Sequence, residues 1–256
     1  MAGTGSGYDL SVTTYTPDGR VYQVEYAQKA VESSGTALAI CFKDGVVFAT
    51  EKLLKSKMLV PGTNKRTYPL SRHAGMVIAG MVPDGRQIVN RGRSEIENYK
   101  NAYAEYMPAD QLADRLGLYV HAHTLYWSYR PFGCSVLMGA VDPETKKPSL
   151  HCVDPSGLVF KYKGTAVGKG KQSAKTEIEK LLGAEGASEL TCKAALAKVA
   201  KILHKVHDEK DSNFELEAAW ICADSDYKFA AVPAALLSEA EDTAKKELEK
   251  EEDGDE

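Results

Sequence analysis

The segment TALAICF, from Thr36 to Phe42, is apolar on both faces of an extended chain. A turn at Lys43-Asp44-Gly45 follows it, and VVFATE at 46–51 then returns, so the two runs predict a β-hairpin. A strand that is apolar on both faces must be covered on both sides. The hairpin is therefore expected inside a sheet that lies between two other layers.

The rest of the chain alternates between groups of strands and groups of helices. Sheets that need cover on both faces, with helices arriving in groups, predict an α+β fold in which two sheets face each other and helices cover the outside of each, a four-layer αββα sandwich. No stretch of the 256 residues reads as a linker, so we expect one domain. Strands are expected at 65–70, 75–81, 134–142, 150–154, 158–164, 165–168, 216–223 and 227–232, and helices at 20–32, from 83, from 108 to 130, at 171–182, at 190–206 and from 233.

The helix expected at 20–32 is apolar around most of its circumference, and its polar residues gather on one narrow face. It has apolar surface for two neighbours, so it lies either deep in one domain or between two subunits. Asp18, in the preceding PDGR turn, is expected to start this helix by accepting hydrogen bonds from its first N–H groups. The same tetrapeptide recurs at 83–86 and is expected to open a second helix through the same capping chemistry.

Charge is distributed unevenly along the chain. Residues 237–256 contain ten acidic residues and three lysines, whereas the whole chain has a net charge of -4. Such a run repels itself, so we expect a solvated, disordered acidic tail at 239–256, or one that docks on a basic surface. Because no basic stripe with interleaved aromatic residues balances it, nucleic acid is not an expected partner.

The cysteine pattern and the hydropathy both indicate a soluble intracellular protein. The five cysteines are widely spaced, with no CxxC pair, and are expected to be reduced core thiols in a protein of the cytoplasm and nucleus. The N-terminus lacks a secretory signal, and no apolar run approaches the roughly 18 to 20 residues that a bilayer requires. We therefore expect no membrane partner.

The residues near the N-terminus resemble a known signature. Tyr8 and Asp9, followed by Thr13 and by PDGRVYQVEYAQKAV at 17–31, are similar to the N-terminal signature of the proteasome alpha subunits. Leu10 stands where most of these subunits have arginine, and together with the acidic end it resembles the type found at the seventh position of the eukaryotic ring. The likeness continues at 43–47, 64–66, 130–133, 154–157 and 166–180.

This resemblance implies the N-terminal-nucleophile hydrolase fold, the same αββα layering, with a mobile gate segment at 1–16, a domain at 17–238 and the tail at 239–256. It implies a non-catalytic subunit of the 20S core particle that acts in ubiquitin-dependent proteolysis as a scaffold, as a gate over the axial pore and as a docking site for activators. The implied partners are neighbouring alpha subunits, beta subunits of the adjacent ring and the C-terminal tails of activators. By resemblance, Tyr8, Asp9, Pro17 and Tyr26 form the gating cluster, Lys65 or Arg66 docks activators, and Tyr22, Val24, Ala27 and Val31 of the first helix contact the ring neighbours.

A catalytic reading rests on the bond between Gly35 and Thr36. In active proteasome subunits, cleavage of a Gly-Thr bond frees a threonine whose own α-amino group serves as the base. By resemblance, Glu51 falls at the position of the acidic partner, but the required lysine falls at Thr67 or Tyr68, and neither carries a positive charge. We therefore expect no catalytic residue. Two alternatives stay open: a threonine protease autocleaved before Thr36, and a monomeric ligand-binding protein of the same fold.

Other candidate motifs are weak. GKGK at 168–171 lacks the third glycine of a dinucleotide fingerprint and the spacing of a P-loop, so a plain turn is favoured. His121 and His123 fall on nearly opposite sides of a helix and cannot share a metal ion. His204 and His207 share a face but end a helix, where they suit the helix dipole. We expect no metal site and no cofactor.

Overall fold

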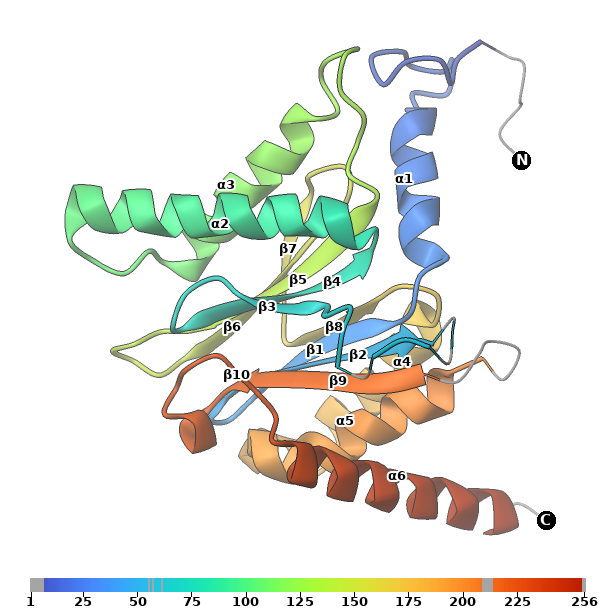
Figure 1. The fold of residues 1–256 in the computed structure, drawn as a ribbon, viewed down its shortest axis with the longest axis vertical. Coiled ribbons are helices and arrows are strands. Elements are labelled where there is room, and N and C mark those ends of the chain that lie inside the picture. The colour runs from blue at the N-terminus through green and yellow to red at the C-terminus, as the bar shows by residue number, and fades with distance from the viewer. Residues whose placement is uncertain (1–6, 55, 57, 61, 209–213, 255–256) are drawn as a thin grey trace.

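The computed structural model describes residues 7–54, 56, 58–60, 62–208 and 214–254 and consists of two antiparallel sheets between two helical layers (Figure 1). The first sheet has the order β10-β9-β2-β1-β8 and contains β1 (Ala37–Phe42), β2 (Gly45–Leu53), β8 (Gly164–Val167), β9 (Phe214–Ile221) and β10 (Ala230–Ala231). The second has the order β3-β4-β5-β6-β7 and contains β3 (Thr67–Pro69), β4 (Ala74–Gly80), β5 (Cys134–Val141), β6 (Pro148–Val153) and β7 (Val159–Tyr162).

The helices cover the outer faces of the two sheets in separate groups. The second sheet packs against α2 (Val82–Tyr103) and α3 (Ala109–Ala122), and the first against α4 (Lys171–Gly183), α5 (Cys192–Val206) and α6 (Ala234–Gly254). The 3₁₀ turns η1 (Ala187–Glu189) and η2 (Ala223–Ser225) complete the described elements. The four-layer αββα sandwich predicted from the sequence is confirmed.

Strand β1 shows why the apolar pattern requires two covers. Its larger side chains, Leu38 and Ile40, pack against helices α4 and α5, whereas Ala37 and Ala39 face the second sheet. All four are completely buried. The sheets approach so closely at Gly139 that a Cβ there would lie 2.6 Å from the Phe48 ring. The helix-facing side of β1 is therefore filled by large residues and the sheet-facing side by small ones.

Helix α1 (Tyr22–Glu32) stands apart from both helical layers, at one end of the sandwich (Figure 1). Val31 is completely buried in the core between the sheets, and Ala27 is only 8% exposed. The side chains of Ala27 and Val31 are thus enclosed by this chain, so the predicted contact of α1 with a neighbouring subunit depends on its more exposed residues. Tyr22 and Val24 remain partly exposed on the helix.

The capping role predicted for Asp18 is wrong. The N-cap of α1 is Val21, which makes no side-chain capping hydrogen bond. Thr16 closes the turn instead: its carbonyl accepts from the Gly19 N–H at 2.9 Å and its hydroxyl accepts from the Arg20 N–H at 3.0 Å. Asp18 stays exposed.

The second PDGR tetrapeptide behaves differently again. Asp84 lies in the first turn of α2, but its carboxylate points out of the helix and accepts from Arg130 Nη1 at 2.6 Å and Nη2 at 2.8 Å. The N–H of Gly133 donates to it at 2.8 Å. Capping of α2 is therefore not the role of this residue. It ties the start of α2 to the segment that leads into β5.

Two further segments differ from the expectations. Helix α3 ends at Ala122, so the stretch expected to continue to residue 130 forms exposed turns, in which Trp127 is 82% exposed. The acidic end does not form a separate disordered tail up to Gly254, because α6 includes it and buries Ala240 and Ala244 against α5. Lys201 of α5 pairs with Glu247 at 3.3 Å. Among the described helices, none is long and apolar enough to cross a lipid bilayer.

Candidate functional site

Thr36 lies where the chain leaves α1 and enters β1, and its polar atoms are all engaged. Its N–H donates to Glu51 Oε1 at 2.6 Å, and its hydroxyl oxygen accepts from the Gly170 N–H at 3.0 Å. Thr36 is 1% exposed. Its nitrogen belongs to the peptide bond with Gly35, so it cannot act as the amino base that activates a terminal threonine.

The structure brings Glu51 to Thr36, as the resemblance implied, but in a structural role. One carboxylate oxygen of Glu51 accepts from Thr36, and the other lies 3.0 Å from Nδ1 of His207, beyond the end of α5. Glu51 is 4% exposed. The carboxylate thereby links β2, the start of β1 and the end of α5. These contacts satisfy its lone pairs, as a buried acid requires.

The resemblance places the lysine of an active subunit at Thr67 or Tyr68, and neither of these side chains carries an ammonium group. The Thr67 N–H donates to Glu217 Oε1 at 2.9 Å, and the Tyr68 hydroxyl donates to the Lys65 carbonyl at 2.7 Å. The buried ammonium of Lys52 is paired with Glu215 at 2.9 Å. Among the described residues, neither position to which the resemblance assigns the lysine therefore supplies the positive charge that would lower the pKa of the threonine hydroxyl.

The GKGK turn packs on the same point of the chain. Gly168 has a φ of +104°, and a Cβ at this position would lie 2.5 Å from the carbonyl oxygen of Gly35. Only glycine allows this close approach. Gly170 supplies the N–H that binds the Thr36 hydroxyl. The glycines serve the packing of the turn against residues 35–36, which agrees with the plain-turn interpretation.

Two of the four residues assigned to the gate meet in the structure. The Tyr26 hydroxyl donates to Asp9 Oδ2 at 3.3 Å, and Gln23 Nε2 donates to the Asp9 carbonyl. Burial, and then the nearby Asp9 carboxylate, raise the pKa of Tyr26 above its ordinary value. Tyr8 is 38% exposed and Pro17 is exposed, and in the described part of the chain no hydrogen bond joins either side chain to this pair.

Two residues of the N-terminal segment before α1 are more buried than its polar composition predicts. Val12 is 4% exposed and Thr16 is 5% exposed, so these two side chains pack against the body of the protein. The mobility expected for the gate segment at 1–16 stays a prediction. Residues 1–6 of the predicted gate segment lie outside the described residues.

The two residues assigned to activator docking precede β3 and differ in exposure. Lys65 is exposed, whereas Arg66 is half-buried and Nη1 donates to the Gly80 carbonyl at 3.4 Å. The Nε of Arg66 is buried without a hydrogen-bond partner. Burial lowers the pKa of Arg66, and the Glu217 carboxylate opposes this shift.

An exposed apolar surface beside α1 was missed by sequence reasoning, and we call it the aromatic end surface. A cavity of about 430 Å³ joins the N-terminal segment to α1 and to the end of α3. The sequence feature that indicates this surface is the aromatic run after His123, which lies within the helix expected from 108 to 130. Tyr15 and Leu125 line this cavity, and we include in the surface the other exposed apolar residues of the same two segments, Leu10, Tyr126, Trp127 and Tyr129; all six are more than 50% exposed.

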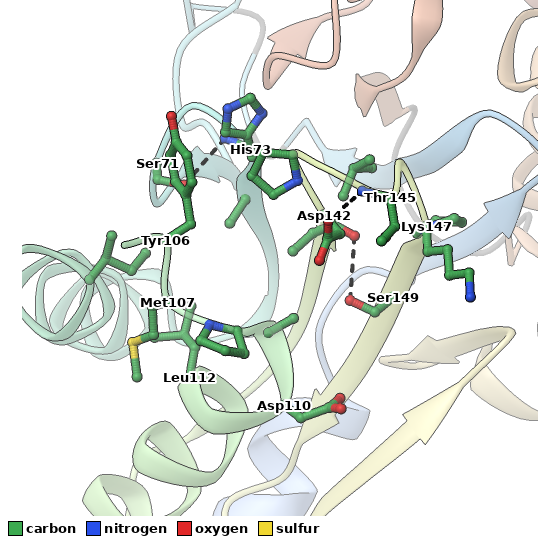
Figure 2. Close-up of a pocket in the computed structure, with 18 of the residues that line it drawn as sticks. Ser71, His73, Tyr106, Met107, Asp110, Leu112, Asp142, Thr145, Lys147 and Ser149 are labelled. Atoms are coloured by element: carbon green, nitrogen blue, oxygen red, sulfur yellow. Dashed lines mark hydrogen bonds between the residues drawn. The ribbon is translucent and has the colours of Figure 1, made fainter. Parts of the chain in front are cut away.

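A second cavity, of about 370 Å³, lies between the start of α3 and the β5–β6 turn (Figure 2). Figure 2 shows Asp110 and Asp142 well apart in it. Asp110 is bound by Lys161 Nζ at 2.7 Å, and the carboxylate of Asp142 accepts the N–H of Thr145 at 2.7 Å. Because both carboxylates are engaged and separated, they do not form an acid-base pair.

Comparisons with known proteins agree with the signature at the N-terminus. The proteasome subunit family matches residues 31–221, and the N-terminal signature of the A-type proteasome subunits matches residues 8–30. The chain is 54% identical over 250 residues to proteasome subunit alpha type-3 of Spinacia oleracea, covering 97% of this chain and 98% of that relative. It is 48% identical over 260 residues to probable proteasome subunit alpha type-7 of Saccharomyces cerevisiae, covering 99% of this chain and 88% of that relative.

Proposed function

This chain belongs to the proteasome alpha subunits, and on that premise we propose how its surfaces serve the ring. It is a non-catalytic subunit of the alpha ring of the 20S core particle, where it associates with other proteasome subunits. The peptide-bonded, buried Thr36 agrees with a subunit that has no peptidase activity. The five free cysteines support a place in the cytoplasm and nucleus.

The observation that carries the ring assignment is the aromatic end surface beside α1. Helix α1 uses Ala27 and Val31 for its own core and leaves Tyr22 and Val24 partly exposed, and Val24 lines the cavity beside this surface. Clustered exposed aromatic residues mark protein interaction sites. We assign Tyr22, Val24 and the aromatic end surface to a contact with one ring neighbour. The stacked beta ring would contact another face.

Native mass spectrometry of the protein from its own cells tests this assignment. We expect the full-length chain, allowing for loss or acetylation of Met1, inside a particle of several hundred kilodaltons. A free monomer would support the ligand-binding alternative. A chain that begins at Thr36 would support the autocleaved protease and contradict the assignment.

The contact between Asp9 and Tyr26 is proposed to brace the N-terminal segment when the pore opens. Tyr26→Phe removes this hydrogen bond, whose net worth is about 0.5 to 1.5 kcal/mol, so activator-stimulated peptide hydrolysis should fall by about two- to ten-fold. Tyr103→Phe is the matched control, because Tyr103 is 61% exposed at the end of α2 and lies outside the N-terminal segment and the aromatic end surface. Unchanged stimulation in the Tyr26 variant would remove this residue from the gate.

Activator tails are proposed to dock beside Lys65 and Arg66, where a cation pairs with the terminal carboxylate. Charge reversal by Arg66→Glu should weaken activator binding by about ten-fold or more and leave the core particle assembled, because a charge-assisted hydrogen bond is worth about 1.5 to 3 kcal/mol. Arg66→Gln tests the same contact by removing the cation without placing a second carboxylate near Glu217.

The same binding measurement on Lys65→Glu decides which of the two cations pairs with the tail. Lys198→Glu, an exposed site on α5, is the control for a general charge effect. Activator affinity that is unaltered in all the variants at 65 and 66 would contradict the docking site.

A further inference from the structure

Three side chains of metal-binding type meet at one end of the first sheet, away from the aromatic end surface. They are the Asp44 carboxylate and the thiols of Cys192 and Cys222, and one ligand atom of each lies within 4.8 Å of those of the other two. Asp44 belongs to the β1–β2 turn, Cys192 is the first residue of α5, and Cys222 follows β9. The sequence predicts both cysteines as reduced core thiols, because the five cysteines are widely spaced and form no CxxC pair.

The three groups are held in place by the fold itself. The Asp44 carboxylate accepts from the Cys192 N–H at 2.7 Å. The Cys222 N–H donates to Ser225 Oγ at 3.0 Å, and the Ser225 N–H donates to the Cys222 sulfur. At Gly45, a Cβ would lie 2.8 Å from the Cα of Cys222, which fixes the turn against β9. The donor set is therefore preorganised on three separate elements.

The chemistry of this set selects a thiophilic divalent ion. Two thiolates and one carboxylate are zinc ligands, with bonds that place ligand atoms about 3.5 to 4 Å apart in a tetrahedron. This spacing lies within the observed 4.8 Å limit. Both cysteines are completely buried, whereas Asp44 is partly exposed, so an ion would enter from the carboxylate side and keep a water molecule there.

The neighbouring lysine does not compete with a metal ion for the Asp44 carboxylate. This residue, Lys43, is the cation nearest to Asp44 in the sequence, and its ammonium is bound to Glu189 instead. We propose that Asp44, Cys192 and Cys222 form a binding site for one zinc-like divalent cation. Binding ties the β1–β2 turn, α5 and the end of β9 together and releases the thiol protons.

Cobalt titration of the reduced full-length chain tests the proposal. Co²⁺ should bind with one ion per chain, give the thiolate charge-transfer absorption and the strong d–d bands of four-coordinate geometry, and be displaced by Zn²⁺. Cys222→Ser should remove the charge-transfer absorption. Cys152→Ser is the matched control, because Cys152 lies in β6 of the other sheet.

Asp44→Asn gives a second test that preserves the fold. The amide oxygen can still accept from the Cys192 N–H, but the anionic ligand is lost, so Zn²⁺ affinity should fall about ten-fold or more. Zn²⁺ should raise the thermal unfolding midpoint of the native sequence and raise that of Asp44→Asn less. Cobalt spectra without thiolate bands, equal spectra in all variants, or a Cys192–Cys222 disulfide in the chain isolated without oxidant would overturn the proposal.

Discussion

Asp84→Ala should lower the free energy of unfolding of the full chain by about 2 to 3 kcal/mol, measured by urea denaturation. Asp84 is 7% exposed, and its removal leaves the buried Gly133 N–H without an acceptor and Arg130 without its bidentate partner. The loss stays below the value for a fully buried pair because the Arg130 side chain is 61% exposed and can return to water. A loss below about 0.5 kcal/mol would contradict this account.

Asp18→Ala is the matched control, because it changes the same position of the same tetrapeptide. Asp18 is exposed and makes no capping bond to α1, so its replacement should change stability by less than about 0.5 kcal/mol. Equal losses at Asp18 and Asp84 would mean that the tetrapeptide acts through local capping and not through the contact with Arg130.

The contribution of Asp84 should also depend on pH. Burial alone raises the pKa of Asp84, but the hydrogen bonds from Arg130 and Gly133 outweigh it and hold the pKa below its ordinary value. The unfolded chain therefore binds the proton at a higher pH than the folded chain does. The stabilisation is complete above the unfolded pKa, near pH 4, and is lost as the pH falls through the lower folded pKa. The difference between the native chain and Asp84→Ala should narrow in that window.

Val24→Glu should prevent most of the chain from entering the alpha ring. A carboxylate buried without a partner at the proposed contact costs at least about 2 kcal/mol, which is roughly a thirty-fold loss of association. Native gels of reconstituted particles, with the variant as the only source of this subunit, would measure the assembled fraction. The isolated variant should unfold like the native chain, because Val24 is partly exposed in the monomer.

Lys29→Glu is the control on the same helix, because it places the same residue on the polar face of α1. It should leave assembly intact. Trp127→Ala probes the other half of the contact. If Trp127 fills a pocket of the neighbour, its removal should weaken assembly by about 2 kcal/mol or more. Normal assembly of both Val24→Glu and Trp127→Ala would move the interface elsewhere.

The layering of this protein could be predicted because the strand pattern leaves few alternatives. TALAICF buries both faces in any fold, and alternating groups of strands and helices then favour two covered sheets. The candidate catalytic centre was also accessible from the sequence. The absence of lysine at Thr67 and Tyr68 is a matter of residue identity, and the structure adds that Thr36 and Glu51 bind each other as buried structural groups.

The division of α1 between core and surface could not be predicted in the same way. Helical periodicity places Val24, Ala27 and Val31 on broad apolar faces but does not say which face the sheets occupy. The enclosure of Val31 depends on how the two sheets meet around it. The cluster of Asp44, Cys192 and Cys222 likewise exists only because β1, α5 and β9 converge.

The sequence by itself determined the two sheets, the helical cover and the family, because these follow from apolar patterns and from motifs that are contiguous in the chain. Only the tertiary structure decided what individual polar groups do. The two PDGR tetrapeptides have the same local chemistry, yet Asp18 faces water while Asp84 binds Arg130 and Gly133. The physical reason is that the partner of a buried carboxylate is whichever donor the fold brings within hydrogen-bonding distance, and that donor can lie far away in the sequence.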